Sequence, residues 1–225
     1  MNKIILIQTG ENIWNSEMRL DSLSGAPLSE LGIKQISDIA EPINAQEPAV
    51  IYTSTGEAEI QTAKLIDNLH NIKIKTDPRL DGIDYGLWQG LTVDEIKRRQ
   101  PSLYKQWQDS PASVRPPGGE TLEEAAARIQ ECFAEVARKE KKVNTVGFIF
   151  RPIVFAICRL ELEQRSLDDL WEMVDPNIAW VSYAQTVDSI VWKQEQVETR
   201  RSGEVELPLE ILPEQQIPQE PKKES

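Results

Sequence analysis

The sequence has 225 residues, of which 40% are hydrophobic, and a formal net charge of −12. This length and composition fit one α/β domain with a large core and exclude a wholly disordered chain. The negative charge argues against nucleic acid as a partner. No apolar run reaches the roughly 20 residues of a membrane span, and the N-terminus lacks a signal-peptide pattern. We therefore expect a cytoplasmic protein.

Strands and helices alternate in the first half of the chain. Short runs rich in Ile and Val predict strands at 3–7, 49–53 and 72–76. Apolar residues at helical spacing predict helices at 29–44, with Ser29 as N-cap, and at 57–69.

Residues 88–116 interrupt this alternation. They predict a short helix at 92–99 and a second helix that starts at Pro101. We interpret the segment as an insertion that covers the pocket at one end of the sheet.

The second half returns to alternating elements. Helices are predicted at 121–139, 153–162 and 167–173, and strands at 143–150, 179–187 and 190–197. Asp188 and Ser189 would form the turn between the last two strands. Cys132 and Cys158 fall in apolar helical patterns, so we expect buried thiols rather than a disulfide or a metal site.

Repeated strand–helix units predict an α/β three-layer sandwich, with a mostly parallel central sheet flanked by helices. Ligands of such sheets bind beyond the carboxyl ends of the strands. The positions to consider are therefore Gln8-Thr9-Gly10, residues 54–58 and Arg151-Pro152.

The last part of the chain has a different composition. Residues 202–225 contain four prolines, six Glu and two Lys, so their net charge is 2 − 6 = −4. We predict one domain over residues 1–200 and an acidic, Pro-rich tail over 201–225 that is extended or disordered. Leu207, Leu209, Ile211 and Leu212 suggest that the tail docks on this protein or on a partner.

Several motifs occur in the order found in a known family. They are Leu6-Ile7-Gln8-Thr9-Gly10-Glu11-Asn12-Ile13-Trp14-Asn15, Ala26-Pro27-Leu28-Ser29-Glu30-Leu31-Gly32, Ile51-Tyr52-Thr53-Ser54, Ile60-Gln61-Thr62-Ala63, Ile83-Asp84-Tyr85-Gly86, Trp88-Gln89-Gly90-Leu91-Thr92, Pro117-Gly118-Gly119-Glu120-Thr121 and Leu167-Asp168-Asp169-Leu170-Trp171. Over residues 3–197 the ordered set resembles the histidine phosphatase superfamily, and so implies a phosphoglycerate mutase-like fold.

The resemblance implies phosphoryl transfer, but this sequence lacks the residues that the family uses for it. The family uses a histidine nucleophile, two arginines and a second histidine that stabilise phosphoryl charge, and a carboxylic acid as proton donor. The nucleophile falls on Thr9, the arginines on Gln8 and Ala58, the acid on Gly82 and the second histidine on Arg151.

The histidine count supports this assignment without any alignment. The chain contains a single histidine, His70, which follows a predicted helix. A phosphoryl-transfer site that needs two histidines therefore cannot form in this chain. The hydroxyl of Thr9 would need an adjacent base to act as a nucleophile. We expect no catalytic residues, no cofactor, no metal and no measurable phosphomonoester hydrolysis.

The altered pocket could still bind an anion weakly. Arg151 supplies a positive charge, and hydrogen-bonding groups are expected from Gln8, Thr9, Gly10, Asn15, Arg19 and Ser24. Alternatively, Arg151 pairs with a nearby carboxylate and fills the space itself.

These observations favour a non-catalytic member that acts as a binding protein, scaffold or complex subunit, with a protein partner or as a homo-oligomer. One alternative is a phosphoesterase or mutase with residual or altered activity. Another is a sensor that binds a phosphorylated metabolite through Arg151.

Overall fold

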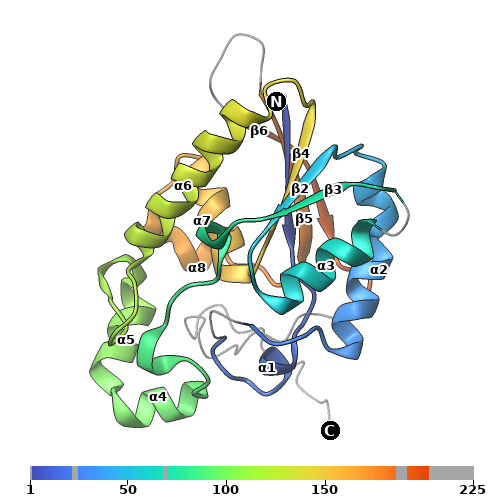
Figure 1. Ribbon diagram of the computed structural model, residues 1–225. Coiled ribbons are helices and arrows are strands. Elements are labelled where there is room, and N and C mark those ends of the chain that lie inside the picture. The colour runs from blue at the N-terminus through green and yellow to red at the C-terminus, as the bar shows by residue number, and fades with distance from the viewer. Residues whose placement is uncertain (1, 22–24, 68–69, 186–191, 203–225) are drawn as a thin grey trace, which may run out of the picture.

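A single six-stranded sheet forms the centre of the molecule (Figure 1). The computed structural model describes residues 2–21, 25–67, 70–185 and 192–202. The strands are β1 (Lys3–Gln8), β2 (Val50–Thr53), β3 (Lys73–Thr76), β4 (Thr145–Phe150), β5 (Ile178–Gln185) and β6 (Trp192–Thr199). Their order is β3-β2-β4-β1-β5-β6, with the first four parallel and the last two antiparallel to their neighbours. The predicted fold class is confirmed.

Helices cover both faces of the sheet. The helices α2 (Glu30–Asn44) and α3 (Glu57–Asp67) lie on one face, and α6 (Leu122–Lys139), α7 (Pro152–Leu162) and α8 (Leu170–Met173) lie on the other (Figure 1). Ser29 accepts a hydrogen bond from the Gly32 amide and so caps α2 as predicted. Thr121 and Glu124 form a capping box that starts α6.

The alternation of side chains along the strands divides the core in two. In β1, Ile5 and Ile7 pack beneath α2 and α3, whereas Ile4 and Leu6 pack with the helices of the opposite face. Strands with both faces covered must be apolar throughout. This requirement explains the Ile- and Val-rich runs from which the strands were predicted.

Residues 88–116 contain α4 (Val93–Arg99) and α5 (Pro101–Asp109). Trp88 and Trp107 of this segment are buried, and Trp107 packs edge-on against Trp171 of α8 at 5.5 Å between ring centroids. The Trp171 indole also donates to the Trp107 carbonyl. These contacts attach α4 and α5 to the α8 side of the core (Figure 1). The interpretation as an insertion stays a prediction.

Some expectations concern parts of the chain outside the described residues. The turn at Asp188-Ser189 and the tail from 203 onwards are among them. No helix within the described ranges is long and apolar enough to cross a bilayer. Cys132 and Cys158 are both buried, free thiols, as expected. The four-residue helix α1 (Ile13–Ser16) was not predicted, because it is too short to show a helical period.

Candidate functional site

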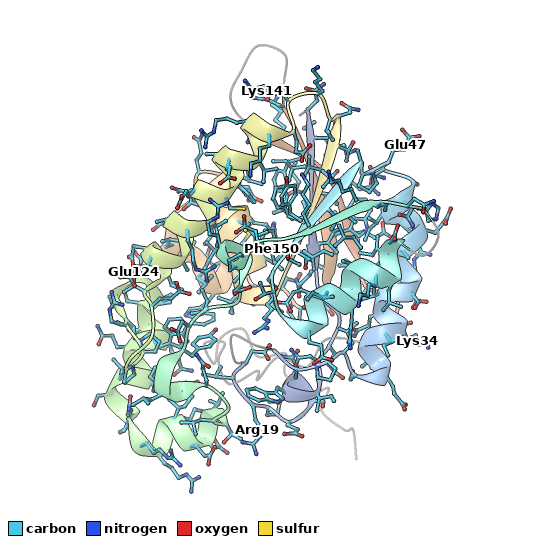
Figure 2. All side chains as sticks on the ribbon, viewed as in Figure 1. Arg19, Lys34, Glu47, Glu124, Lys141 and Phe150 are labelled. Carbon is cyan, nitrogen blue, oxygen red and sulfur yellow. The ribbon has the colours of Figure 1, made fainter. Side chains whose placement is uncertain are left out.

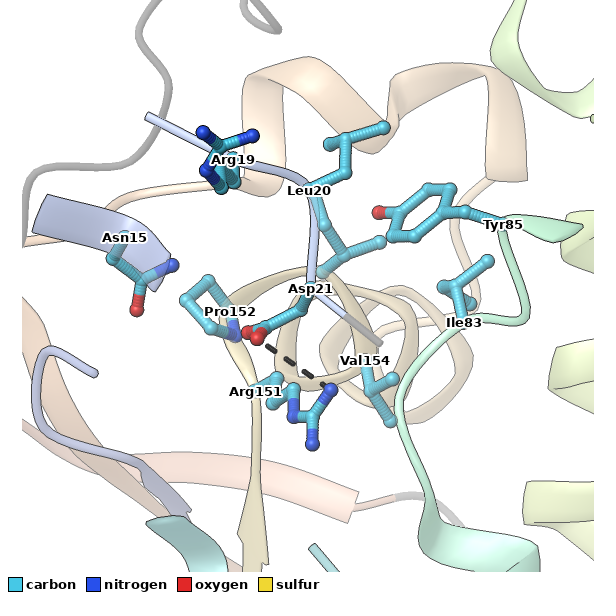
Figure 3. A pocket seen from close by; sticks show the side chains of 10 residues that line it. Asn15, Arg19, Leu20, Asp21, Ile83, Tyr85, Arg151, Pro152 and Val154 are labelled. Carbon is cyan, nitrogen blue, oxygen red and sulfur yellow. Dashed lines mark ion pairs between the residues drawn. The ribbon is translucent and has the colours of Figure 1, made fainter. Parts of the chain in front are cut away.

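A small hollow lies at the carboxyl edge of the sheet, where β4 ends and α7 begins. Figure 2 shows Phe150, the last residue of β4, in the middle of the molecule and Arg19 at the end that carries α1. Residues from four separate segments line the hollow: Asn15, Arg19, Leu20, Asp21, Ile83, Tyr85, Arg151, Pro152, Ile153 and Val154 (Figure 3). This is the edge at which open α/β sheets bind ligands.

Arg151 forms a buried ion pair at the bottom of this hollow. Its Nε lies 2.7 Å from Oε1 of Glu59, a residue of α3 that is fully buried. Its Nη1 lies 3.9 Å from Oδ2 of Asp21 (Figure 3). Burial opposes the guanidinium charge, but Glu59 and Asp21 outweigh it, so the pKa of Arg151 is raised. The alternative in which Arg151 pairs with a carboxylate is the one observed.

Three glycines make room for the guanidinium. A Cβ atom at Gly25, Gly56 or Gly82 would lie 2.4, 2.6 or 2.9 Å from a terminal guanidinium nitrogen of Arg151. Side chains at these positions would therefore compete with Arg151 for space. Gly82 is also the position on which the resemblance places the proton donor. Arg151 thus occupies space that a side chain at position 82 would need.

Asp21 is a second acid in the hollow, and its environment favours the protonated form. Burial raises the pKa of Asp21, and the negative charge of Glu59 raises it further, against the opposing effects of Arg151 and Asn12. Asn12 donates to Oδ2 at 2.8 Å, whereas the buried Oδ1 has no hydrogen-bond partner in the described part of the chain. The carboxyl group lies beside the first turn of α7 (Figure 3).

The N-terminus of α7 adds positive potential to the same place. Its N-cap, Arg151, makes no side-chain capping bond, and Pro152, Ile153 and Val154 of its first turn line the hollow. A helix N-terminus carries about half a positive charge and attracts anions. On the opposite wall, Arg19 donates from Nη1 to the Gly90 carbonyl at 2.8 Å and pairs through Nε with Glu17 at 3.0 Å.

The structure brings only some of the predicted pocket residues together. Asn15, Arg19 and Arg151 line the hollow. Gln8 and Thr9 are buried beside it, and Gln8 donates to the Asp175 carbonyl at 3.1 Å. 

The other predicted pocket residues have different positions. Gly10 packs against α2, where a Cβ would lie 2.5 Å from the Gly32 oxygen. Ala58 is buried in the core under α2 and α3 rather than facing the hollow. Ser24 lies outside the described residues, and His70 is exposed and away from the hollow.

The sequence did not single out Asp21 or the role of Glu59. Glu59 was visible only as an acidic neighbour of Ala58, although it shares a buried helix face with Thr62, Ala63 and Ile66. A carboxylate on an apolar face requires a buried cation. The position of Glu59 on an apolar helix face could therefore have predicted its pairing with Arg151. Asp21 lies in an irregular segment that has no periodicity to read.

Residues 4–194 match the sequence model of the histidine phosphatase superfamily, branch 1. The chain belongs to this superfamily. Phosphoserine phosphatase 1 of Hydrogenobacter thermophilus is 31% identical over 180 residues, which are 80% of this chain and 85% of that protein. A Yersinia pestis protein named "Probable phosphoglycerate mutase GpmB" is 30% identical over 129 residues, or 57% of this chain and 60% of its own length.

Solved structures agree with the membership in the histidine phosphatase superfamily. Bacillus stearothermophilus YhfR superposes with a TM-score of 0.80 at 26% identity and covers 90% of this chain and 98% of its own. The mycobacterial glucosyl-3-phosphoglycerate phosphatase Rv2419c superposes with a TM-score of 0.75 at 22% identity, covering 89% and 99%. At that identity the second likeness shows the fold alone.

The expectation of a non-catalytic protein is wrong. Two relatives that match this chain are named as a phosphatase and a mutase, and these names point to an enzyme. The expectation treated the loss of histidines at positions 9 and 151 as the loss of all chemistry. It took no account of Asp21, an acid with a raised pKa in the hollow.

The glycine positions give a first prediction. Gly82→Ala should lower the melting temperature, because the new Cβ meets the Arg151 guanidinium at 2.9 Å. Overpacking of this kind costs roughly 1–3 kcal/mol. In an Arg151→Ala background the same change should cost much less, although that background is itself destabilised by the unpaired Glu59. Thermal unfolding of the four proteins of this double-mutant cycle measures the coupling, and purely additive effects would contradict the assignment.

Proposed function

We propose that this protein is a phosphoesterase of the histidine phosphatase superfamily that hydrolyses a small phosphomonoester without a phosphohistidine. Its family membership and the names of its relatives support a phosphoesterase. The observation that carries the altered chemistry is Asp21, a carboxylic acid with a raised pKa beside an uncapped helix N-terminus.

The first step is binding of the phosphoryl group in the hollow. The N-terminus of α7 would attract its oxygens, and Asn15 offers a further polar group, whereas Arg19 already pairs with Glu17. Arg151 contributes little net charge, because Glu59 already neutralises it. An ionised Asp21 would repel the phosphoryl group, whereas a protonated Asp21 would not. The raised pKa of Asp21 therefore favours binding as well as catalysis.

The second step is transfer to water. The water oxygen forms a bond to phosphorus while the ester P–O bond breaks, and the leaving oxygen takes the proton from Asp21. The attacking water loses a proton, which restores the acid form of Asp21. Phosphoryl transfer passes through a loose transition state that demands mainly positioning and charge stabilisation. General acid catalysis typically contributes 10²–10⁴-fold to the rate.

The sensor alternative receives less support. It needs the charge of Arg151 for the ligand, and the ion pairs with Glu59 and Asp21 already occupy that charge. A protein partner or a homo-oligomer stays a prediction that these observations do not bear on.

The proposed role of Asp21 can be tested by substitution. Across a panel of small phosphomonoesters at pH 5, we expect slow turnover by the wild-type protein and a fall of roughly 10² or more in kcat for Asp21→Asn. The reason is that an amide cannot supply the leaving-group proton. Asp94→Asn, at an exposed position in the first turn of α4, is the matched control. The absence of wild-type turnover, or an equal kcat in Asp21→Asn, would overturn the proposal.

The pH dependence gives an independent test. The folded pKa of Asp21 is raised, so its acid form persists to higher pH than that of an ordinary aspartate. We expect kcat/KM to be greatest at acidic pH and to fall as the pH rises through this raised pKa. Glu59→Gln should move the fall to lower pH, since it removes a negative charge near Asp21. A pH-rate profile that rises across the same range would contradict this assignment.

A further inference from the structure

Arg200 lies directly after β6, at the same edge of the sheet as the hollow, and its side chain reaches back toward β1. Its Nη2 donates to the carbonyl of Thr9 at 2.6 Å, and its Nε donates to the carbonyl of Pro176 at 3.0 Å. Its backbone amide is held by the Asn177 carbonyl at 2.8 Å. The guanidinium is therefore fixed between the end of β1 and the segment that leads into β5.

The third nitrogen of this guanidinium has no acceptor in the part of the chain that the structure describes. Nη1 of Arg200 is buried and makes no hydrogen bond to any residue that the structure describes. Buried polar groups are almost always hydrogen-bonded, so an orphaned N–H indicates a water or a ligand. The carbonyls of Thr9 and Pro176 accept from the other two nitrogens.

Among the described residues, the charge of Arg200 also has no counterion. Its only partners are two neutral carbonyls, and within the described ranges it forms no ion pair. Burial alone lowers the pKa of Arg200 to about 10, with no carboxylate to offset the effect. Arg151, which directly follows β4, has two carboxylates. A buried charge normally requires a partner of opposite sign, which a water molecule cannot provide.

We propose that Arg200 is the binding residue of a second anion site, which takes a small oxyanion such as phosphate or a carboxylate group. Nη1 donates the hydrogen bond, and the uncompensated guanidinium supplies the charge. The site is separate from the hollow of the proposed function, because Arg200 is not among the residues that line it. Arg200 contacts Thr9 from the side of β5, whereas Arg151 follows β4, which pairs with the other edge of β1.

Thermal unfolding of the full chain with inorganic phosphate at pH 8 tests this proposal, with chloride at matched ionic strength as reference. At pH 8 Arg200 stays charged, because its pKa of about 10 lies above that pH. We expect a saturable rise in melting temperature. The rise should be lost in Arg200→Gln and kept in Arg201→Gln, the matched control, because Arg201 is exposed and pairs with Glu198.

Several outcomes would overturn the proposal. They are an equal response in Arg200→Gln and no response in any form of the protein. A response that appears only after Glu204→Gln and Glu206→Gln would also overturn it, because the chain's own carboxylates would then fill the site. If Arg200→Gln fails to fold, Arg200→Lys keeps the charge and should respond only at higher phosphate concentration. The response is a shift in unfolding temperature at pH 8, so the result does not depend on turnover at pH 5.

Discussion

The ion pair between Arg151 and Glu59 is the interaction on which the rest of the site depends. Both side chains are buried at the carboxyl edge of the sheet, and neither charge could remain there alone. The guanidinium fills space that three glycines leave open. The negative charge of Glu59 then acts on Asp21 and helps to raise its pKa. One buried pair therefore determines the packing and the charge of the hollow, and it adds to the effect of burial on Asp21.

The fold could be predicted from the sequence because its strands are buried on both faces. The runs that became β1, β2 and β4 had to be apolar throughout, and the helices between them had to place one apolar face on the sheet. Ser29 was correctly predicted as the N-cap of α2, because a capping residue is a local signal. Short elements such as α1 have no such period and were missed.

The site was predicted less well, because its contacts connect distant parts of the chain. Arg151 and Glu59 are 92 positions apart, and no local pattern links them. The altered positions at Thr9, Gly82 and Arg151 are visible in the motifs, but the groups that take the place of the missing ones are not. Ala58 was predicted in the pocket, but it lies in the core, and Glu59, the next residue, pairs with Arg151. The motifs show which of the family's residues are missing, whereas only the packed structure shows that Glu59 and Asp21 lie beside Arg151.

The proposed chemistry follows from these substitutions. A histidine nucleophile needs dense positive charge around the phosphoryl oxygens, whereas this hollow combines a neutralised arginine, a helix N-terminus and an acid. Such a site is suited to protonating a leaving group while water attacks. Its rate would be limited by the modest positive charge that remains for the phosphoryl group.

The most direct test of this account is a ¹³C NMR titration of the Asp21 carboxyl group in the folded, full-length protein. The account predicts a midpoint clearly above 3.8, the ordinary value for aspartate, because burial and Glu59 favour the acid form. A midpoint at or below that value would mean that Arg151 and Asn12 control this carboxylate. Asp21 would then be an ion-pair partner of Arg151 rather than a proton donor, and the account would be wrong.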